Sequence, residues 1–171
     1  EWGLGPVDAL TTGDLTGDGK VDVILARNNT LEMHANTGAG TFAPPKLVSL
    51  GSAIARDLVL VDLDLDGDLD LASVVGGRVV LHSNEGGNQN HWIDVVVRGD
   101  PSPDAQKPDL RVNVHCIGSL AELKSGSIYQ AKPVTGQTTH FGLGKGDQID
   151  VLRVILTNGV PQSLLQPSTN Q

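Results

Sequence analysis

Two short windows of the sequence place acidic residues at alternate positions, from Asp14 to Asp22 and from Asp62 to Asp70. A hard divalent cation such as calcium takes about six to eight oxygen ligands, and alternate residues of a tight loop can aim carboxylates at one point. Gly19 and Gly67 allow the sharp bend in the middle of each window. We therefore predict two calcium sites. The predicted ligands are Asp14, Thr16, Asp18, the backbone carbonyl of Lys20 and Asp22 in the first, and Asp62, Asp64, Asp66, Asp68 and Asp70 in the second.

The two windows differ in charge and both differ from a helix-flanked calcium loop. Thr16 stands where the second window has Asp64, so we expect tighter binding in the second. An EF-hand loop begins in the same way but closes with an acid at its twelfth position, where these windows have Leu25 and Ser73. Apolar and β-branched residues follow each window, which favours strands on both sides of the loops.

The acidic windows belong to a longer repeat with an offset of 48 residues, in which Asp62 is the counterpart of Asp14. His34 and Asn36 match His82 and Asn84 at that same offset. A repeat of this length that contains a small antiparallel sheet is typical of a β-propeller blade, which buries its faces only against neighbouring blades. The predicted fold is all-β, with two blade repeats of an incomplete propeller at residues 7–50 and 55–90, in a first domain of residues 1–90.

These repeats resemble the FG-GAP or VCBS repeats of integrin-α-like propellers over residues 7–88. The resemblance implies a calcium loop between strands and a non-enzymatic module for protein interaction, adhesion or scaffolding. Two blades do not close a propeller, so we expect missing blades or another protein partner, with the chain as the C-terminal part of a larger protein or a subunit of an assembly. Calcium at extracellular concentration fills such loops, which favours a secreted, cell-surface or periplasmic location.

Residues 91–171 carry a different pattern of short alternating strands, which predicts a small antiparallel β-sandwich or barrel. We expect one of these strands at Leu110–Cys116, after a Pro-rich loop at residues 100–109. This half resembles the ASPIC/UnbV domain of cartilage-acidic-protein-like and enediyne-cluster proteins. The resemblance rests on Trp92, Arg111–Val114, Ser125–Gln130, His140–Gly144 and Asp150–Val154.

Charge and hydropathy argue against a nucleic-acid partner and against a transmembrane segment. The chain has 12 basic and 20 acidic residues, and it carries a net charge of −8, whereas a nucleic-acid-binding surface needs a surplus of Lys and Arg. No run of apolar residues is long enough to predict a transmembrane segment.

Two alternative functions stay open. A carbohydrate-binding propeller would normally expose several aromatic platforms, and the sequence has only two Trp and one Tyr. A biosynthetic enzyme of the enediyne-cluster type would need a polar site, but no spacing brings a nucleophile and a base together. We therefore predict no enzymatic activity. We expect the single Cys116 to fill the core, and Arg98-Gly99-Asp100 to be an ordinary turn at a strand end rather than a recognition motif.

Overall fold

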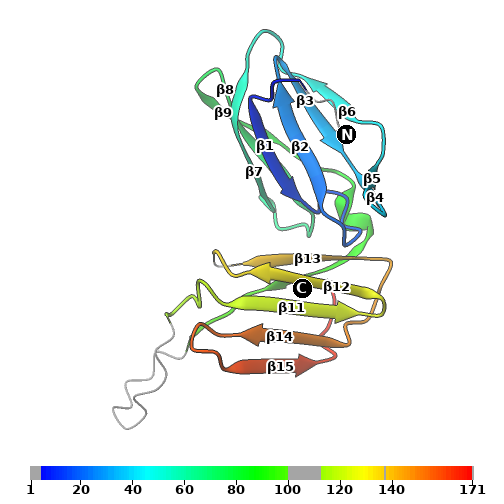
Figure 1. Cartoon of the computed structure of the whole chain (residues 1–171), viewed down its shortest axis with the longest axis vertical. Coiled ribbons are helices and arrows are strands. Elements are labelled where there is room, and N and C mark those ends of the chain that lie inside the picture. Colours follow the sequence, from blue (N-terminus) through cyan, green and yellow to red (C-terminus); the bar gives the residue numbers. More distant parts are fainter. Residues whose placement is uncertain (1–4, 100–112, 137, 171) are drawn as a thin grey trace. The chain divides into compact units, whose positions relative to one another are not determined.

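The computed structural model describes residues 5–99, 113–136 and 138–170. The chain divides into two compact units, Glu1–Gln89 and Asn90–Gln171. Both units consist of antiparallel sheets, and the helical content of the described residues is one short 3-10 turn, η1 (Gly87–Gln89). The predicted all-β fold is confirmed (Figure 1).

The first sheet of the first unit has four strands in the order β1-β2-β3-β6. They are β1 (Ala9–Gly13), β2 (Asp22–Arg27), β3 (Thr30–His34) and β6 (Lys46–Ser49). Asn28 has a φ of 55°, which lets the chain reverse tightly between β2 and β3. The connection between β3 and β6 contains a small hairpin of β4 (Asn36–Gly38) and β5 (Thr41–Phe42).

The second sheet repeats the first three strands of this arrangement. It contains β7 (Ala55–Val61), β8 (Asp70–Val75) and β9 (Arg78–His82), in that order. Strands β2 and β8 start at equivalent positions of the repeat, and so do β3 and β9. The pairing register is repeated as well, because Val23 faces His34 in the first sheet and Leu71 faces His82 in the second.

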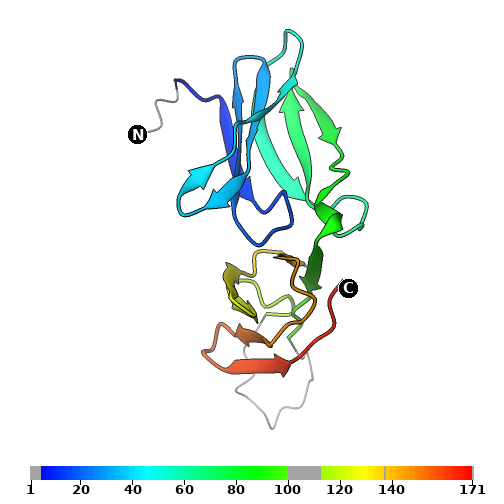
Figure 2. The same ribbon diagram turned by 90° about the vertical axis from the view of Figure 1, so that its right-hand side faces the viewer.

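The two sheets pack face to face and enclose one hydrophobic core (Figure 2). A Cβ at Gly13 would lie 2.7 Å from Cδ1 of Leu60, so β1 approaches β7 closely at this point. Burial of each large apolar side chain contributes about 1.5–3 kcal/mol, so this core links the two blade-like sheets into one unit. Its buried members are Leu15, Ile24, Ala26, Leu31, Ala55, Leu58 and Leu71.

The second unit combines a sheet of two strands with a sheet of four. Strands β10 (His91–Val95) and β13 (Thr139–Gly144) form the smaller sheet. The larger has the order β12-β11-β14-β15, from β11 (Leu120–Ser125), β12 (Ile128–Pro133), β14 (Val151–Ile155) and β15 (Pro161–Leu165). Their inward faces share a core, as in a sandwich. The buried members are Ile93, Val95, Ala121, Leu123, Val134, Phe141, Leu143, Ile149 and Leu152.

The strand predicted at Leu110–Cys116 is wrong in its described part. Residues 114–115 and 117–118 lie in turns, and Cys116 has a φ of 51°, which an extended strand does not allow. The Asn113 side chain accepts a hydrogen bond from the N–H of Ile117 at 2.8 Å and donates one to its carbonyl at 2.9 Å, which closes the turn. Leu110–Val112 and the Pro-rich loop lie outside the described residues. Cys116 is free and fully buried, and burial raises the pKa of its thiol.

Candidate metal centre

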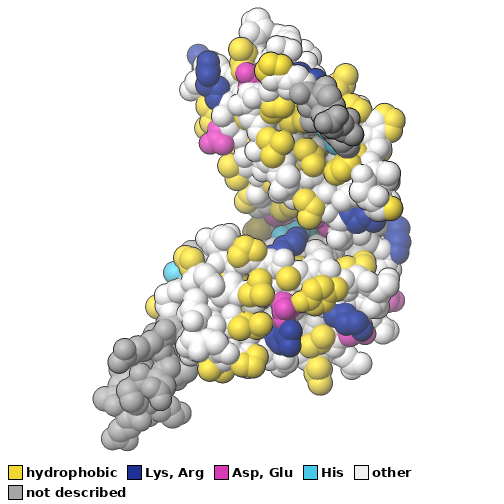
Figure 3. Space-filling view, in the orientation of Figure 1, with side chains coloured by type: hydrophobic (Ala, Val, Ile, Leu, Met, Phe, Trp, Pro, Cys, Tyr) yellow, Lys and Arg dark blue, Asp and Glu magenta, His cyan; other side chains and the backbone are white. Residues whose placement is uncertain are grey.

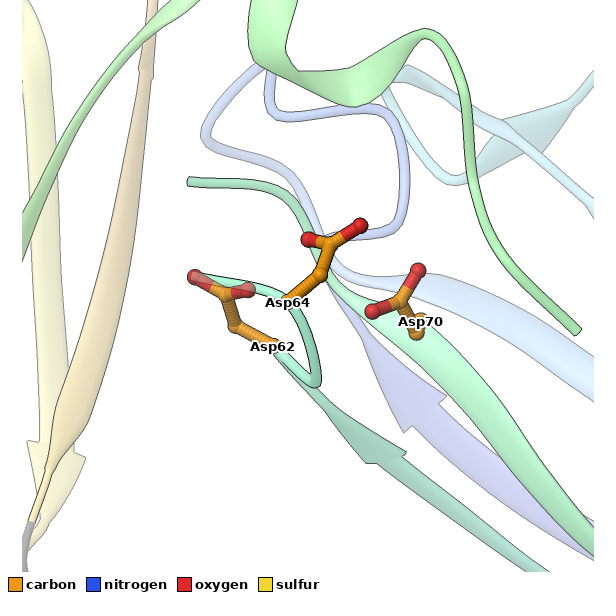
Figure 4. Close-up of side chains that lie close together, drawn as sticks. All are labelled: Asp62, Asp64 and Asp70. Atoms are coloured by element: carbon orange, nitrogen blue, oxygen red, sulfur yellow. The ribbon is translucent and has the colours of Figure 1, made fainter. Parts of the chain in front are cut away.

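The second acidic loop joins β7 to β8 and brings three carboxylates together. Asp62 follows the last residue of β7, and Asp70 begins β8 directly opposite that residue in the ladder. Oxygen atoms of Asp62, Asp64 and Asp70 all lie within 4.8 Å of one another, a separation at which a single metal ion could bind all three (Figure 4). Within the part of the chain that the structure describes, no other three His, Cys, Asp or Glu residues are grouped in this way.

Backbone amides of the loop, together with that of Asn84 after β9, orient the outer two of these carboxylates. Asp62 accepts hydrogen bonds from the N–H groups of Leu65 at 2.7 Å and Gly67 at 3.2 Å. Asp70 accepts from Leu63 at 2.9 Å and from Asn84 at 2.8 Å. These bonds hold the carboxylates of Asp62 and Asp70 in place, so a cation at this position would meet oxygens that are already ordered.

Asp66 and Asp68, also predicted as ligands, lie outside the group of three. The Asp68 side chain is 1% exposed, and its Oδ2 accepts a hydrogen bond from the N–H of Gly87 at 3.1 Å. Asp66 Oδ1 accepts from the N–H of Asp68 at 3.1 Å. The Asp68 carboxylate thus fixes the start of η1 against the loop.

Desolvation and neighbouring negative charges both act on Asp64. Desolvation raises the pKa of this carboxyl above its usual value of 3.8, and the negative charges of Asp66, Asp70 and Asp62 raise it further, while a backbone hydrogen bond from Asp66 opposes them. The charged form of Asp64 is therefore disfavoured in the folded loop, and a bound cation would relieve that cost.

The first acidic loop has a similar backbone scaffold, in which two of the four hydrogen-bond donors are shifted by one residue. Asp14 accepts hydrogen bonds from the amides of Asp18 at 3.0 Å and Gly19 at 2.8 Å, as Asp62 accepts from its own loop. Asp22 accepts from Thr16 at 2.9 Å and from Asn36 at 2.8 Å, as Asp70 accepts from Leu63 and Asn84.

Two features set the first loop apart from the second. The ammonium group of Lys20 forms an ion pair with Asp18, so a positive charge already lies on one of the predicted ligands. The second feature is the residue type at one position, where the first loop has Gly17 and the second has Leu65. Both residues have the left-handed conformation, with φ values of 67° and 64°. The second loop therefore keeps the fold of the first at the cost of a strained leucine.

Sequence reasoning did not identify the residues that brace the two loops. The Asn84 side chain donates to the carbonyl of Leu15 at 2.8 Å, which joins the second repeat to the first acidic loop. Gly87 also approaches this carbonyl closely, because a Cβ there would lie 3.0 Å from it. The matching of Asn36 with Asn84 was the only signal in the sequence, and it marked the position without its contacts.

The two repeat-equivalent histidines have different partners. His34 Nε2 lies 3.3 Å from Glu32 Oε2, whereas His82 Nε2 lies 3.0 Å from Ser73 Oγ. Partial burial lowers the pKa of His82. The His34 contact lies within β3 of the first sheet, and the His82 contact joins β9 to β8 in the second sheet. Neither histidine belongs to the acidic group described above.

Comparison with known proteins gives one match. A family model described as an FG-GAP-like repeat matches residues 14–73, which is about a third of the chain and includes both acidic loops. No curated protein and no solved structure matches the chain. No helix among the described residues is long and apolar enough to cross a membrane.

The match supports a general function. FG-GAP-like repeats typically occur in extracellular proteins, are generally non-enzymatic, and indicate a β-propeller-like interaction module. The predicted FG-GAP resemblance is confirmed for residues 14–73. The ASPIC/UnbV resemblance of the second half stays a prediction.

Proposed function

We propose that residues 5–89 form a calcium-stabilised, non-enzymatic interaction module that acts outside the cell, at the cell surface or in the periplasm, and that each acidic loop binds one Ca²⁺ ion. The observation that carries the proposal is the group of oxygen atoms of Asp62, Asp64 and Asp70, within 4.8 Å of one another on a loop braced by its own amides. Calcium accepts such all-oxygen sites with flexible geometry.

The second loop is the stronger of the two proposed sites. Its ion would be held by the three grouped carboxylates, with Asp66 and the backbone carbonyl of Asp68 completing the ligands. In the first loop the equivalent ligands are Asp14, Thr16, Asp18, Lys20 and Asp22, and the Lys20 ammonium competes with an ion for Asp18. A calcium titration should therefore fill the second loop at lower free calcium than the first.

The outward faces of the two sheets support an interaction role. In the first sheet, Leu10 is 56% and Leu47 is 64% exposed, and Figure 3 shows hydrophobic side chains spread over the sheet that faces the viewer in the first unit. In the second sheet, Val59 is 52%, Val79 is 70% and Leu81 is 60% exposed, all on the face opposite the core. Apolar faces of this kind are normally covered by a partner.

The repeat indicates what kind of partner fits the second sheet. Ile24 in the first sheet packs into the core between the sheets, and its counterpart in the second repeat is Ala72, which lies on the exposed face of the second sheet. By this equivalence, the face that carries Ala72 is suited to a further blade-like sheet. We propose missing propeller blades or another β-sheet protein as the partner of this face, with residues 90–171 as an attached ASPIC/UnbV-like β domain.

Carbohydrate binding is the second candidate, because one observation favours it. Tyr129 is 60% exposed on the outer face of the four-stranded sheet of the second unit, where its hydroxyl donates to Glu122 at 2.7 Å beside Arg153. An exposed aromatic ring next to fixed polar groups can stack on a sugar. A glycan array with a Tyr129→Ala variant tests this alternative directly.

Thermal unfolding in calcium and in EGTA tests the proposed function. For a site with a Kd of about 10⁻⁴–10⁻³ M, calcium at about 10 mM should stabilise the native state by about 1.4–2.7 kcal/mol per site. Magnesium at the same concentration should stabilise it less, since it demands a tighter octahedral site. Equal melting in calcium and EGTA by a chain that unfolds cooperatively in both would refute the proposal.

Matched variants localise the effect. The double variant Asp18→Asn with Asp64→Asn should lose the calcium-dependent rise in melting temperature. Asp57→Asn is the control, because Asp57 is an exposed carboxylate on β7 outside both loops. A rise that persists in the double variant would show that calcium binds elsewhere.

A further inference from the structure

The two sheets of the first unit differ by one strand. The first sheet ends with β6 paired to β3, whereas the second ends at β9, the counterpart of β3. Among the residues that the structure describes, no strand pairs with the outer edge of β9. The position that β6 occupies beside β3 is therefore open in the second sheet.

The segment that would fill this position by sequence is used in another sheet. Residues 94–97 are the counterparts of β6 at the offset of the repeat, but Asp94 pairs with His140 and Val95 with Thr139 in the sheet of β10 and β13. The repeat is thus broken at the point where its fourth strand should return.

The side chains of β9 offer little protection against pairing with another strand. Natural edge strands usually carry charges, proline or a bulge that discourage such pairing. Arg78 is the only residue of β9 with a permanent charge, and the strand has neither proline nor glycine. Val79 and Leu81 are 70% and 60% exposed. A strand of this kind is a template for strand addition.

A cavity lies beside the same strand. It has a volume of about 360 Å³ and lies between the two sheets, lined by Leu31 and Val48 on one side and by Leu71 and His82 on the other, with Glu85 at its margin. His82 faces the first sheet, because it is opposite Leu71 in the ladder and Leu71 belongs to the core. Alternate side chains of a strand added to β9 would therefore point into this cavity.

We propose that β9 binds an extended segment of another protein, which adds to the second sheet as an antiparallel fourth strand. The register follows from β6, in which Leu47 pairs with Glu32 and Lys46 pairs with Met33. The added segment has alternating apolar residues that enter the cavity, and a basic residue at its N-terminal end, at the position equivalent to Lys46. That residue lies opposite Leu81, at the end of β9 from which the chain runs on to Glu85.

Charge complementarity supports a basic residue at this end of the segment. In the first sheet, Lys46 lines a neighbouring cavity together with Asp22 and His34. The residue opposite Leu81 lies on the outer face of the second sheet, where the counterpart of Asp22 is Asp70. The exposed Glu85 follows β9 at this end and adds a further negative charge. This inference rests on the proposed interaction role and specifies the chemistry of the partner.

The test uses a fluorescent peptide with the sequence of residues 44–51, which contains β6, and measures its binding to the whole chain by anisotropy. Two further peptides carry N-methyl groups, one at the positions of Leu47 and Ser49 and the other at those of Lys46 and Val48. Only one of these sets of amides faces the edge of β9. One methylated peptide should therefore bind as the parent peptide does, and the affinity of the other should fall by about tenfold or more. Equal affinity of the two methylated peptides would overturn the proposal.

Variants of the protein place the site and separate it from the calcium proposal. Glu85→Lys should weaken peptide binding, whereas the control Asp57→Lys, on the outer face of β7, should leave it unchanged. If calcium raises the melting temperature and no peptide binds, strand addition is refuted while the calcium role stands. If the peptide binds and calcium does not change the melting temperature, the calcium role is refuted while strand addition stands. A dimer of the chain that the peptide dissociates would overturn the assignment to a different protein in favour of a second copy.

Discussion

Gly87 provides the sharpest test of how the acidic loops are held together. A Cβ at this residue would lie 2.6 Å from Cβ of Asp68, 3.0 Å from Nδ2 of Asn84 and 3.0 Å from the carbonyl oxygen of Leu15. The carbonyl oxygen of Leu15 belongs to the backbone, and Cβ of Asp68 is bonded directly to its own backbone. Neither atom can therefore move like the end of a flexible side chain. Gly87→Ala therefore forces η1 away from both loops.

The expected loss of stability follows from these contacts. Overpacking of a filled site costs about 1–3 kcal/mol. The shift also lengthens the 3.1 Å hydrogen bond from the Gly87 amide to the buried Asp68 carboxylate, and a bond to a charged group contributes about 1.5–3 kcal/mol. We expect a total loss of about 2–4 kcal/mol, which for a unit of this size lowers the melting temperature by about 8 °C or more.

Gly86→Ala is the matched control, because a Cβ at Gly86 meets no atom within 4 Å. Neither glycine has a positive φ, so alanine fits the backbone of both, and Gly86→Ala should be neutral or stabilise by up to about 1 kcal/mol. Urea unfolding of the whole chain, with hydrogen exchange of amides in β2 and β8 to report on the first unit, measures both variants. Equal stability of the two variants would refute the tight packing of η1 against the loops.

Two further predictions concern the second loop. In EGTA, Asp64→Asn should melt above the parent at neutral pH. Folding raises the pKa of Asp64 above its usual value of 3.8, so the parent has its full stability only below that pH, where the carboxyl is protonated. This stability is lost as the pH rises through the folded-state pKa, whereas the neutral Asn side chain does not titrate. The difference between variant and parent should shrink on acidification, and a difference independent of pH would contradict this cause. Leu65→Gly should stabilise the chain by up to about 1 kcal/mol, because it removes the left-handed strain of a leucine that is 78% exposed, while Gly17→Leu should destabilise it in urea unfolding. Loss of stability in Leu65→Gly would show that the side chain of Leu65 contributes more than its strain costs.

Much of the first unit could be predicted from local sequence patterns. The spacing of the aspartates predicted two loops with strands on both sides, and the structure has them between β1 and β2 and between β7 and β8. The positive φ of Gly19 and Gly67 agrees with the predicted bend. These features depend on residues close in sequence, whose types restrict the backbone directly.

The second half was less predictable for the same reason. The alternation of apolar residues predicted strands where β10, β11, β12 and β14 occur. It also predicted a strand that reaches Cys116, where the Asn113 side chain instead closes a turn. Alternation alone does not distinguish a strand from a turn that buries its apolar residues.

The sequence by itself determined that this chain has two acidic loops at equivalent positions of a repeat, because alternation, glycine and aspartate act over a short stretch of chain. The tertiary structure decided which carboxylates meet. It grouped Asp62, Asp64 and Asp70 and turned Asp68 toward Gly87, although all four aspartates have the same side chain. It also decided that Asp94 and Val95 pair with β13 and leave β9 without a fourth strand. Such choices depend on which distant strand offers the better pairing and burial, and that competition cannot be read from the spacing of residues along the chain.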